Sequence, residues 1–206
     1  MTPVLDLTLF STTFLTLFVI MDPPGTVPVF LALTSRMTAA ERGRAALQAT
    51  LVALGVVLAF TVFGQAILAW LHISVPALQA SGGLLLLLVA MELLTGRAEE
   101  PKASASGVNV ALVPLGTPLL AGPGAIVASM VAVQSSDGSA ADWAAILLAI
   151  VAVHLCLYLA MRFANQVHRV LGDGGTTLVT RIAGVLLAAI AVQLIADAVI
   201  AFVQTA

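Results

Sequence analysis

The sequence predicts an all-α integral membrane protein: six transmembrane helices in two inverted three-helix repeats, with the first and fourth helices broken mid-membrane. Three observations lead to this prediction. The 206 residues are 61% hydrophobic and only 9% charged, whereas soluble domains carry about 25% charged residues. Six apolar segments are long enough to cross a bilayer. The first and fourth segments each contain clustered prolines and glycines. The offset between these two clusters is nearly the same as the offset between the similar third and sixth segments.

Each apolar segment approaches the roughly 20 residues that a helix needs to cross the hydrocarbon core. The polar connections are too short to hold a soluble domain, so residues 1–206 are expected to form one transmembrane domain. The first segment lacks the basic start of a secretory signal and is expected to remain as a membrane helix. The six segments are 7–33, 45–71, 75–95, 109–133, 142–164 and 180–203.

The basic residues predict the orientation of these helices. All eight would lie on one side of the membrane if the six helices cross alternately. Because positive residues collect on the cytoplasmic side, both termini are expected outside the cell membrane, in the periplasm of a prokaryote. The basic residues are Arg36, Arg42, Arg44, Arg97, Lys102, Arg162, Arg169 and Arg181.

The two halves of the chain resemble each other. Pro24-Gly25 in the first segment matches Pro123-Gly124 in the fourth at an offset of 99 residues. "GLLLLLVAMELL" in the third segment matches "GVLLAAIAVQLI" in the sixth at an offset of 101. Two matches at nearly one offset predict the duplication of a three-helix unit, and the odd number of helices inverts the second copy. Inverted repeats with helices broken at corresponding positions are typical of secondary transporters.

The repeats and their connection divide the chain into three parts. Repeat one is expected at about 5–96, a cytoplasmic linker at about 97–106 and repeat two at about 107–204.

The two breaks would expose backbone groups deep in the membrane. A proline in a helix interior removes one donor and costs ~3 kcal/mol or more, and backbone freed in this way must line protein or a watery cavity. Half-helices beginning near Thr26 and Ala125 would present free amides, which suit a carboxylate. The carbonyls that end the preceding half-helices suit an ammonium or a cation. The breaks are therefore predicted to bind a zwitterion.

Charged and titratable residues within the segments are the next candidates. A carboxylate near the bilayer centre usually marks a substrate, ion or proton pathway, so Asp22 is expected to bind a substrate ammonium, bind Na⁺ or carry a proton. Asp22 also suits the cap of the following half-helix. His154 either relays protons or is a hydrogen-bonded interior histidine. Glu92 and Asp197 are interpreted as reaching the membrane interface, and Arg181 as an orientation charge.

Three motifs carry a family resemblance: "DPPGTVPVF", "PLGTPLLAGPGAI" and "RIAGVLLAAIAVQ". They resemble the MarC/SnatA family of six-helix prokaryotic inner-membrane proteins, over essentially the whole chain. The resemblance implies transport of small neutral amino acids such as glycine and alanine. The family commonly has Asn where this chain has Thr26, which keeps a hydroxyl but lacks the amide donor. The family pattern falls on Asp22, Pro23, Gly25, Pro118, Gly122, Pro123, Gly124, Arg181 and Gln193.

The leading hypothesis is a secondary transporter of glycine-, alanine- or serine-like amino acids that works by alternating access, coupled to Na⁺ or H⁺. The alternatives are an exporter or passive channel for other small solutes, and an intramembrane enzyme. The enzyme is disfavoured because the chain has no G-x-S-x-G, no H-E-x-x-H and no pair of mid-membrane aspartates. We expect no cofactor and no nucleic-acid partner. Asp22 and His154 are the candidates for coupling or proton relay, with Na⁺ near Asp22. The predicted substrate-binding residues are Asp22, Pro23, Gly25, Thr26, Thr117, Pro118, Gly122, Pro123, Gly124 and Ala125.

Overall fold

The computed structural model describes residues 6–96 and 121–205, and all regular structure within them is helical. Five spans are long and apolar enough to cross a membrane, and the first of them, Leu7–Leu31, joins two helices. A shorter apolar helix covers Gly124–Gln134. The prediction of an all-α membrane protein is therefore confirmed. The helices are α1 (Leu7–Met21), α2 (Pro23–Leu33), α3 (Ala39–Trp70), α4 (Val75–Thr95), α5 (Pro123–Gln134), α6 (Ala140–Arg162) and α7 (Ala164–Thr205).

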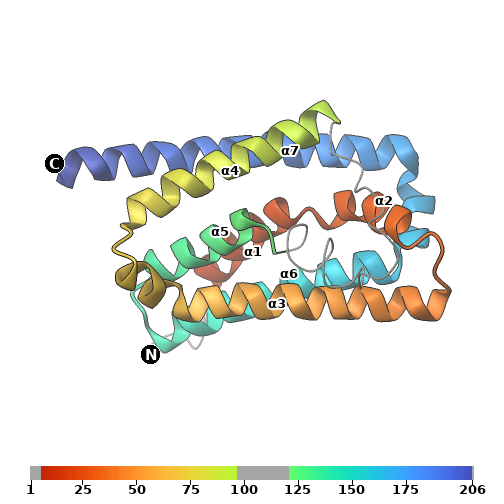
Figure 1. Ribbon diagram of the computed structural model, residues 1–206, viewed down its shortest axis with the longest axis horizontal. Coiled ribbons are helices and arrows are strands. Elements are labelled where there is room, and N and C mark those ends of the chain that lie inside the picture. Colours follow the sequence, from red (N-terminus) through yellow and green to blue (C-terminus); the bar gives the residue numbers. More distant parts are fainter. Residues whose placement is uncertain (1–5, 97–120, 206) are drawn as a thin grey trace.

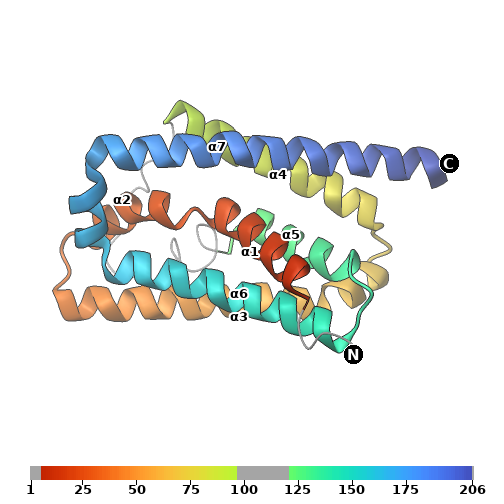
Figure 2. The ribbon, with the colours of Figure 1, turned by 180° about the vertical axis from the view of Figure 1, so that it is seen from behind.

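The helices lie along one long axis in three layers (Figures 1 and 2). α4 and α7 pack side by side as one outer layer, and α3 and α6 form the other. α1, α2 and α5 lie between them, where α1 contacts α6 and α2 contacts both α6 and α7. The interrupted first span is therefore enclosed by protein on two sides.

The connections divide between the two ends of the bundle. The start of α1, the end of α7 and the α3–α4 and α5–α6 connections lie at one end, and the α2–α3 and α6–α7 connections lie at the other (Figures 1 and 2). The second end holds Arg36, and Arg42, Arg162 and Arg169 belong to the helices that meet there. The arrangement agrees with the one-sided charge pattern of the sequence. Which end faces the cytoplasm remains a prediction from that pattern.

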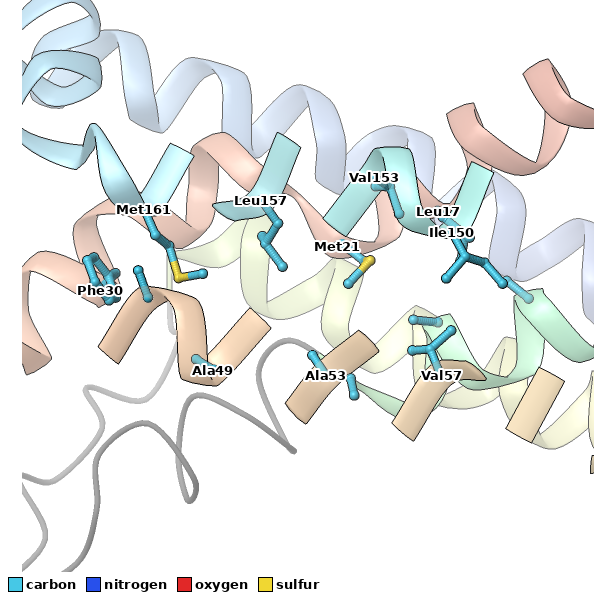
Figure 3. Close-up of a cluster of buried hydrophobic side chains, with 14 of the residues drawn as sticks. Leu17, Met21, Phe30, Ala49, Ala53, Val57, Ile150, Val153, Leu157 and Met161 are labelled. Carbon is cyan, nitrogen blue, oxygen red and sulfur yellow. The ribbon is translucent and has the colours of Figure 1, made fainter. Parts of the chain in front are cut away.

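The core between α1, α3 and α6 uses residues of contrasting size (Figure 3). Small side chains recur every fourth residue on α3, so its backbone approaches the larger side chains of α6 closely. Helix association inside a membrane depends on such packing because lipid is as apolar as the side chains. The core includes Leu17 and Met21 of α1, Phe30 of α2, Ala49, Ala53 and Val57 of α3, and Ile150, Val153, Leu157 and Met161 of α6.

Two helices are longer than the hydropathy pattern predicts. α3 begins at Ala39 rather than 45, because the side chains of Thr38 and Glu41 form a reciprocal capping box. The polar stretch before residue 180, expected as a connection, is helical and belongs to α7 apart from a kink at Gly172. Gly172 has a positive φ of 64°, which glycine adopts without steric cost.

The paired breaks and the inverted repeat are not tested by the described residues. Residues 109–120 of the predicted fourth segment, 109–133, lie outside the described residues. So does all of the predicted linker, 97–106. The two-repeat organisation therefore stays a prediction.

Candidate functional site

The first span changes helix at Asp22. α1 ends at Met21, and Asp22 donates its amide to the carbonyl of Phe18 at 3.1 Å before the backbone turns left-handed, with φ 39° and ψ 68°. Asp and Asn adopt this conformation more readily than other non-glycine residues. α2 then starts with Pro23 and Pro24 in its first turn, where a missing N–H leaves no helical hydrogen bond unmade.

The two carboxylate oxygens of Asp22 have different surroundings. Oδ1 accepts a hydrogen bond from the amide of Gly25 at 3.1 Å and so caps α2. The Asp22 carbonyl accepts from both the amide and the hydroxyl of Thr26, at 3.0 and 2.9 Å. Oδ2 is buried and makes no hydrogen bond in the part of the chain that the structure describes. One oxygen caps the helix, and the other is buried beside the hydroxyl of Thr180 of α7.

The expectation of free amides at the start of α2 is wrong. Pro23 and Pro24 have no N–H, and the next two amides, of Gly25 and Thr26, both donate to Asp22. The prolines that end α1 also remove the donors that would have bound a carboxylate. What this end of α2 offers is the second carboxylate oxygen of Asp22, which suits a cation or an ammonium.

Asp22 lines a cavity of about 360 Å³ between the α1–α2 junction, the end of α4 and the first half of α7. We call this the Asp22 cavity. Its wall carries both signs of charge and several hydroxyls. The polar side chains that line it are Asp22, Thr26, Glu92, His168, Thr176, Thr177, Thr180 and Arg181.

Gly25 is required by the closeness of the carboxylate to α7. A Cβ at position 25 would lie 1.9 Å from Asp22 Oδ2 and 2.8 Å from the Thr180 hydroxyl. The absence of a side chain therefore lets the Asp22 carboxylate and Thr180 occupy the same corner of the cavity. Sequence reasoning missed Thr180. Its signal was the spacing of Thr176 and Thr180, which puts two hydroxyls on the same face of the helix.

Glu92 and Arg181, which the sequence placed at the membrane interface, both line the Asp22 cavity. Close packing of α4 against α7 brings them there. A Cβ on Gly83 would lie 2.8 Å from the carbonyl of Ala191, and one on Gly184 would lie 3.3 Å from the carbonyl of Ala90. Small residues at these two positions let the helix backbones approach.

The residues predicted for the second break occupy a different place. Gly122, Gly124 and Ala125 do not line the Asp22 cavity. Gly122 precedes α5 without a side-chain cap, and Pro123 is the first residue of the helix. A Cβ on Gly124 would lie 2.0 Å from a methyl of Leu86 and 3.2 Å from a methyl of Ile20. The start of α5 therefore packs against the end of α1. Thr117 and Pro118 lie outside the described residues.

His154 lies in the core rather than at a cavity. It is 1% exposed, and Nδ1 is 2.7 Å from the carbonyl of Ile150. Nε2 makes no hydrogen bond among the described residues. His154 lines neither the Asp22 cavity nor the second cavity described below.

The helices and the charged cavity among them define a multi-pass integral membrane protein. The chain matches, over residues 7–203, the model of a family described as "MarC family integral membrane protein". It belongs to this family, which confirms the resemblance to MarC. It is 39% identical to a UPF0056 membrane protein of Methanocaldococcus jannaschii, with 95% of this chain and 98% of the relative covered.

Two further relatives come from Escherichia coli. The UPF0056 membrane protein YhcE is 34% identical, with 88% of this chain and 87% of the relative covered. The UPF0056 inner membrane protein MarC is 28% identical, with 89% and 90% covered. No solved structure matches the chain.

Proposed function

We propose that this protein is a secondary transporter of small neutral amino acids of the glycine, alanine and serine type. The observation that carries the proposal is Asp22, which lines a cavity of about 360 Å³ and whose buried Oδ2 has the Thr180 hydroxyl beside it but no charged partner among the described residues. Buried charged oxygens are costly unless they are paired. An ammonium group in the cavity supplies the missing partner.

Arg181 binds the carboxylate of the substrate. Its guanidinium has donors arranged to match a carboxylate, and it lines the same cavity as Asp22. A small zwitterion placed between them satisfies both groups, with the Thr180 hydroxyl able to donate or accept beside them. A cavity of this volume holds a small amino acid together with water.

A count of charges favours coupling to a cation. With His168 counted as neutral, Asp22 and Glu92 contribute two negative charges to the cavity and Arg181 contributes one positive charge. A zwitterion adds none. One Na⁺ or one proton, held by the carboxylates, balances the occupied cavity. Transport then proceeds by alternating access across the prokaryotic inner membrane, with both termini on the outer side.

Uptake into vesicles tests this proposal. Purified protein is reconstituted, and labelled glycine, alanine and serine are offered under an inward Na⁺ gradient, an inward proton gradient or neither. We expect accumulation above the external concentration under one gradient only. Equal internal and external concentrations under all conditions would indicate a passive channel instead. No flux of any of the three amino acids in either direction would reject the substrate class.

A further inference from the structure

A second cavity of about 290 Å³ lies toward the termini, between the first half of α1, the C-terminal half of α5 and the last third of α7. It shares no lining residue with the Asp22 cavity. Its wall is mostly apolar, with five polar side chains and no formal charge. The polar lining residues are Thr12, Thr13, Thr16, Ser135 and Gln193. We call it the threonine cavity.

The hydroxyls of α1 in this cavity have no hydrogen bond among the described residues. Threonines elsewhere in the bundle donate to the carbonyl one turn earlier, as Thr50 does to Ala46 at 2.9 Å. Thr13 makes no such bond although it is only 5% exposed, and its side chain lines the cavity. The Thr13 hydroxyl is therefore free to form a hydrogen bond with whatever fills the cavity, water included.

A thin apolar layer separates the two cavities. Ile20 of α1, Leu86 of α4 and Leu187 of α7 pack in one cluster, and Leu86 and Leu187 are 2% and 0% exposed. On α1 the lining of the threonine cavity ends at Leu17 and that of the Asp22 cavity begins at Ile20. The two cavity linings are therefore separated on α1 by about 4.5 Å along the helix axis, at 1.5 Å per residue.

The start of α5 completes this layer. Gly124 has Leu86 and Ile20 where its Cβ would be, so a larger residue would hold the two apart. The glycine predicted for the second break is thus placed at the contact between the cavities.

We propose that the threonine cavity is a second binding site for the same small zwitterionic amino acid, on the side of the two termini, and that Ile20, Leu86 and Leu187 close it from the Asp22 cavity. This inference rests on the proposed function. Hydroxyls both donate and accept hydrogen bonds, so they solvate an ammonium and a carboxylate alike without a fixed charge. Weak binding of this kind lets a solute leave again, as conduction requires.

Thiol labelling tests the site without any need for transport. Cys156 is the single cysteine of the chain, so Cys156→Ala provides a cysteine-free background. Thr16→Cys places a thiol in the threonine cavity, and Leu15→Cys, 59% exposed on the outside of the bundle, is the matched control one residue away. A charged, membrane-impermeant methanethiosulfonate reagent is added from the side of the termini.

We expect Thr16→Cys to react at least about 10-fold faster than Leu15→Cys, because the reactive thiolate forms in water and not in lipid. Glycine or alanine at saturating concentration should slow the reaction. Equal rates at the two positions would contradict a water-accessible cavity at Thr16. A fast reaction that neither amino acid slows would contradict amino-acid binding in this cavity. Protection by amino acid in a protein that shows no uptake would reject transport but keep this site.

The apolar layer is tested from the same side. A thiol at Thr180→Cys, in the Asp22 cavity, should react faster when Leu187→Ala opens the layer. The neighbouring Leu186→Ala, on an exposed position, should leave the rate unchanged. No difference between these two variants would overturn the barrier. If Leu187→Ala does not fold, Leu187→Val trims the same contact and serves the same comparison.

Discussion

The amide of Gly25 donates a hydrogen bond of 3.1 Å to Oδ1 of Asp22, and a side chain at Gly25 would collide with Oδ2 of the same carboxylate. Gly25 thus determines the positions of both carboxylate oxygens of Asp22. Its amide uses one oxygen to cap α2, and its missing side chain leaves room for the other oxygen beside Thr180. Asp22 is therefore a helix cap, and its second role, as a ligand, belongs to the proposed function.

Asp22→Asn separates these roles. The amide oxygen of Asn still caps α2, so we expect a thermal stability close to that of the wild type. The charge is lost, and a hydrogen bond to a charged group contributes about 1.5–3 kcal/mol. Uptake efficiency (kcat/KM) should fall about 10- to 100-fold on this basis. The measurement is initial uptake of labelled amino acid into vesicles.

Asp6→Asn is the matched control for this variant. Asp6 caps α1 through the amide of Leu9 and does not line the Asp22 cavity. The same chemical change there should leave uptake intact. Uptake by Asp22→Asn at the wild-type rate would remove Asp22 from the mechanism.

Gly25→Ala tests the space around the carboxylate. The new Cβ would have to displace Oδ2, which lies 1.9 Å away. Because Ala favours helix over Gly by about 1 kcal/mol, any loss of uptake would not come from a weaker helix. We expect uptake to be lost. Gly55→Ala, where nothing lies within 4 Å of the new Cβ, should retain uptake with equal or slightly higher thermal stability. Similar uptake by both variants would contradict the assigned geometry.

Arg181→Gln should raise KM for the amino acid, because the partner of the substrate carboxylate is lost. Charged hydrogen bonds of about 1.5–3 kcal/mol predict an increase of about 10- to 100-fold. Arg169→Gln removes the same charge from a residue of α7 that does not line the Asp22 cavity and should leave KM unchanged. If both variants change KM alike, the effect is one of surface charge and not of a substrate contact.

Sequence reasoning reached the features that depend on local chemistry. The helix end at Asp22 follows from an aspartate before two prolines, and the aspartate itself was the predicted ligand. Thr180 and Arg181 were not predicted to line the Asp22 cavity, because α7 reaches the cavity through packing against α4, and hydropathy does not show which helices meet. Free amides were predicted because helix ends usually have them. Pro23 and Pro24, which marked the break, have no amide hydrogen, and the next two amides, of Gly25 and Thr26, donate to Asp22.

His154 offers a test of the alternative left open in the sequence. The His154 side chain is buried, is hydrogen-bonded to the carbonyl of Ile150 and lines neither cavity. We therefore expect His154→Leu, which keeps an apolar side chain in the core but cannot carry a proton, to retain uptake with the same dependence on pH. The carbonyl of Ile150 still accepts its helical hydrogen bond, so thermal stability should change by only about 1 kcal/mol. The readout is uptake between pH 5.5 and 8 with and without a proton gradient, a range about 1–1.5 pH units either side of the ordinary pKa of His. Loss of gradient-driven accumulation in a variant that still exchanges amino acid across the vesicle would assign His154 to proton transfer.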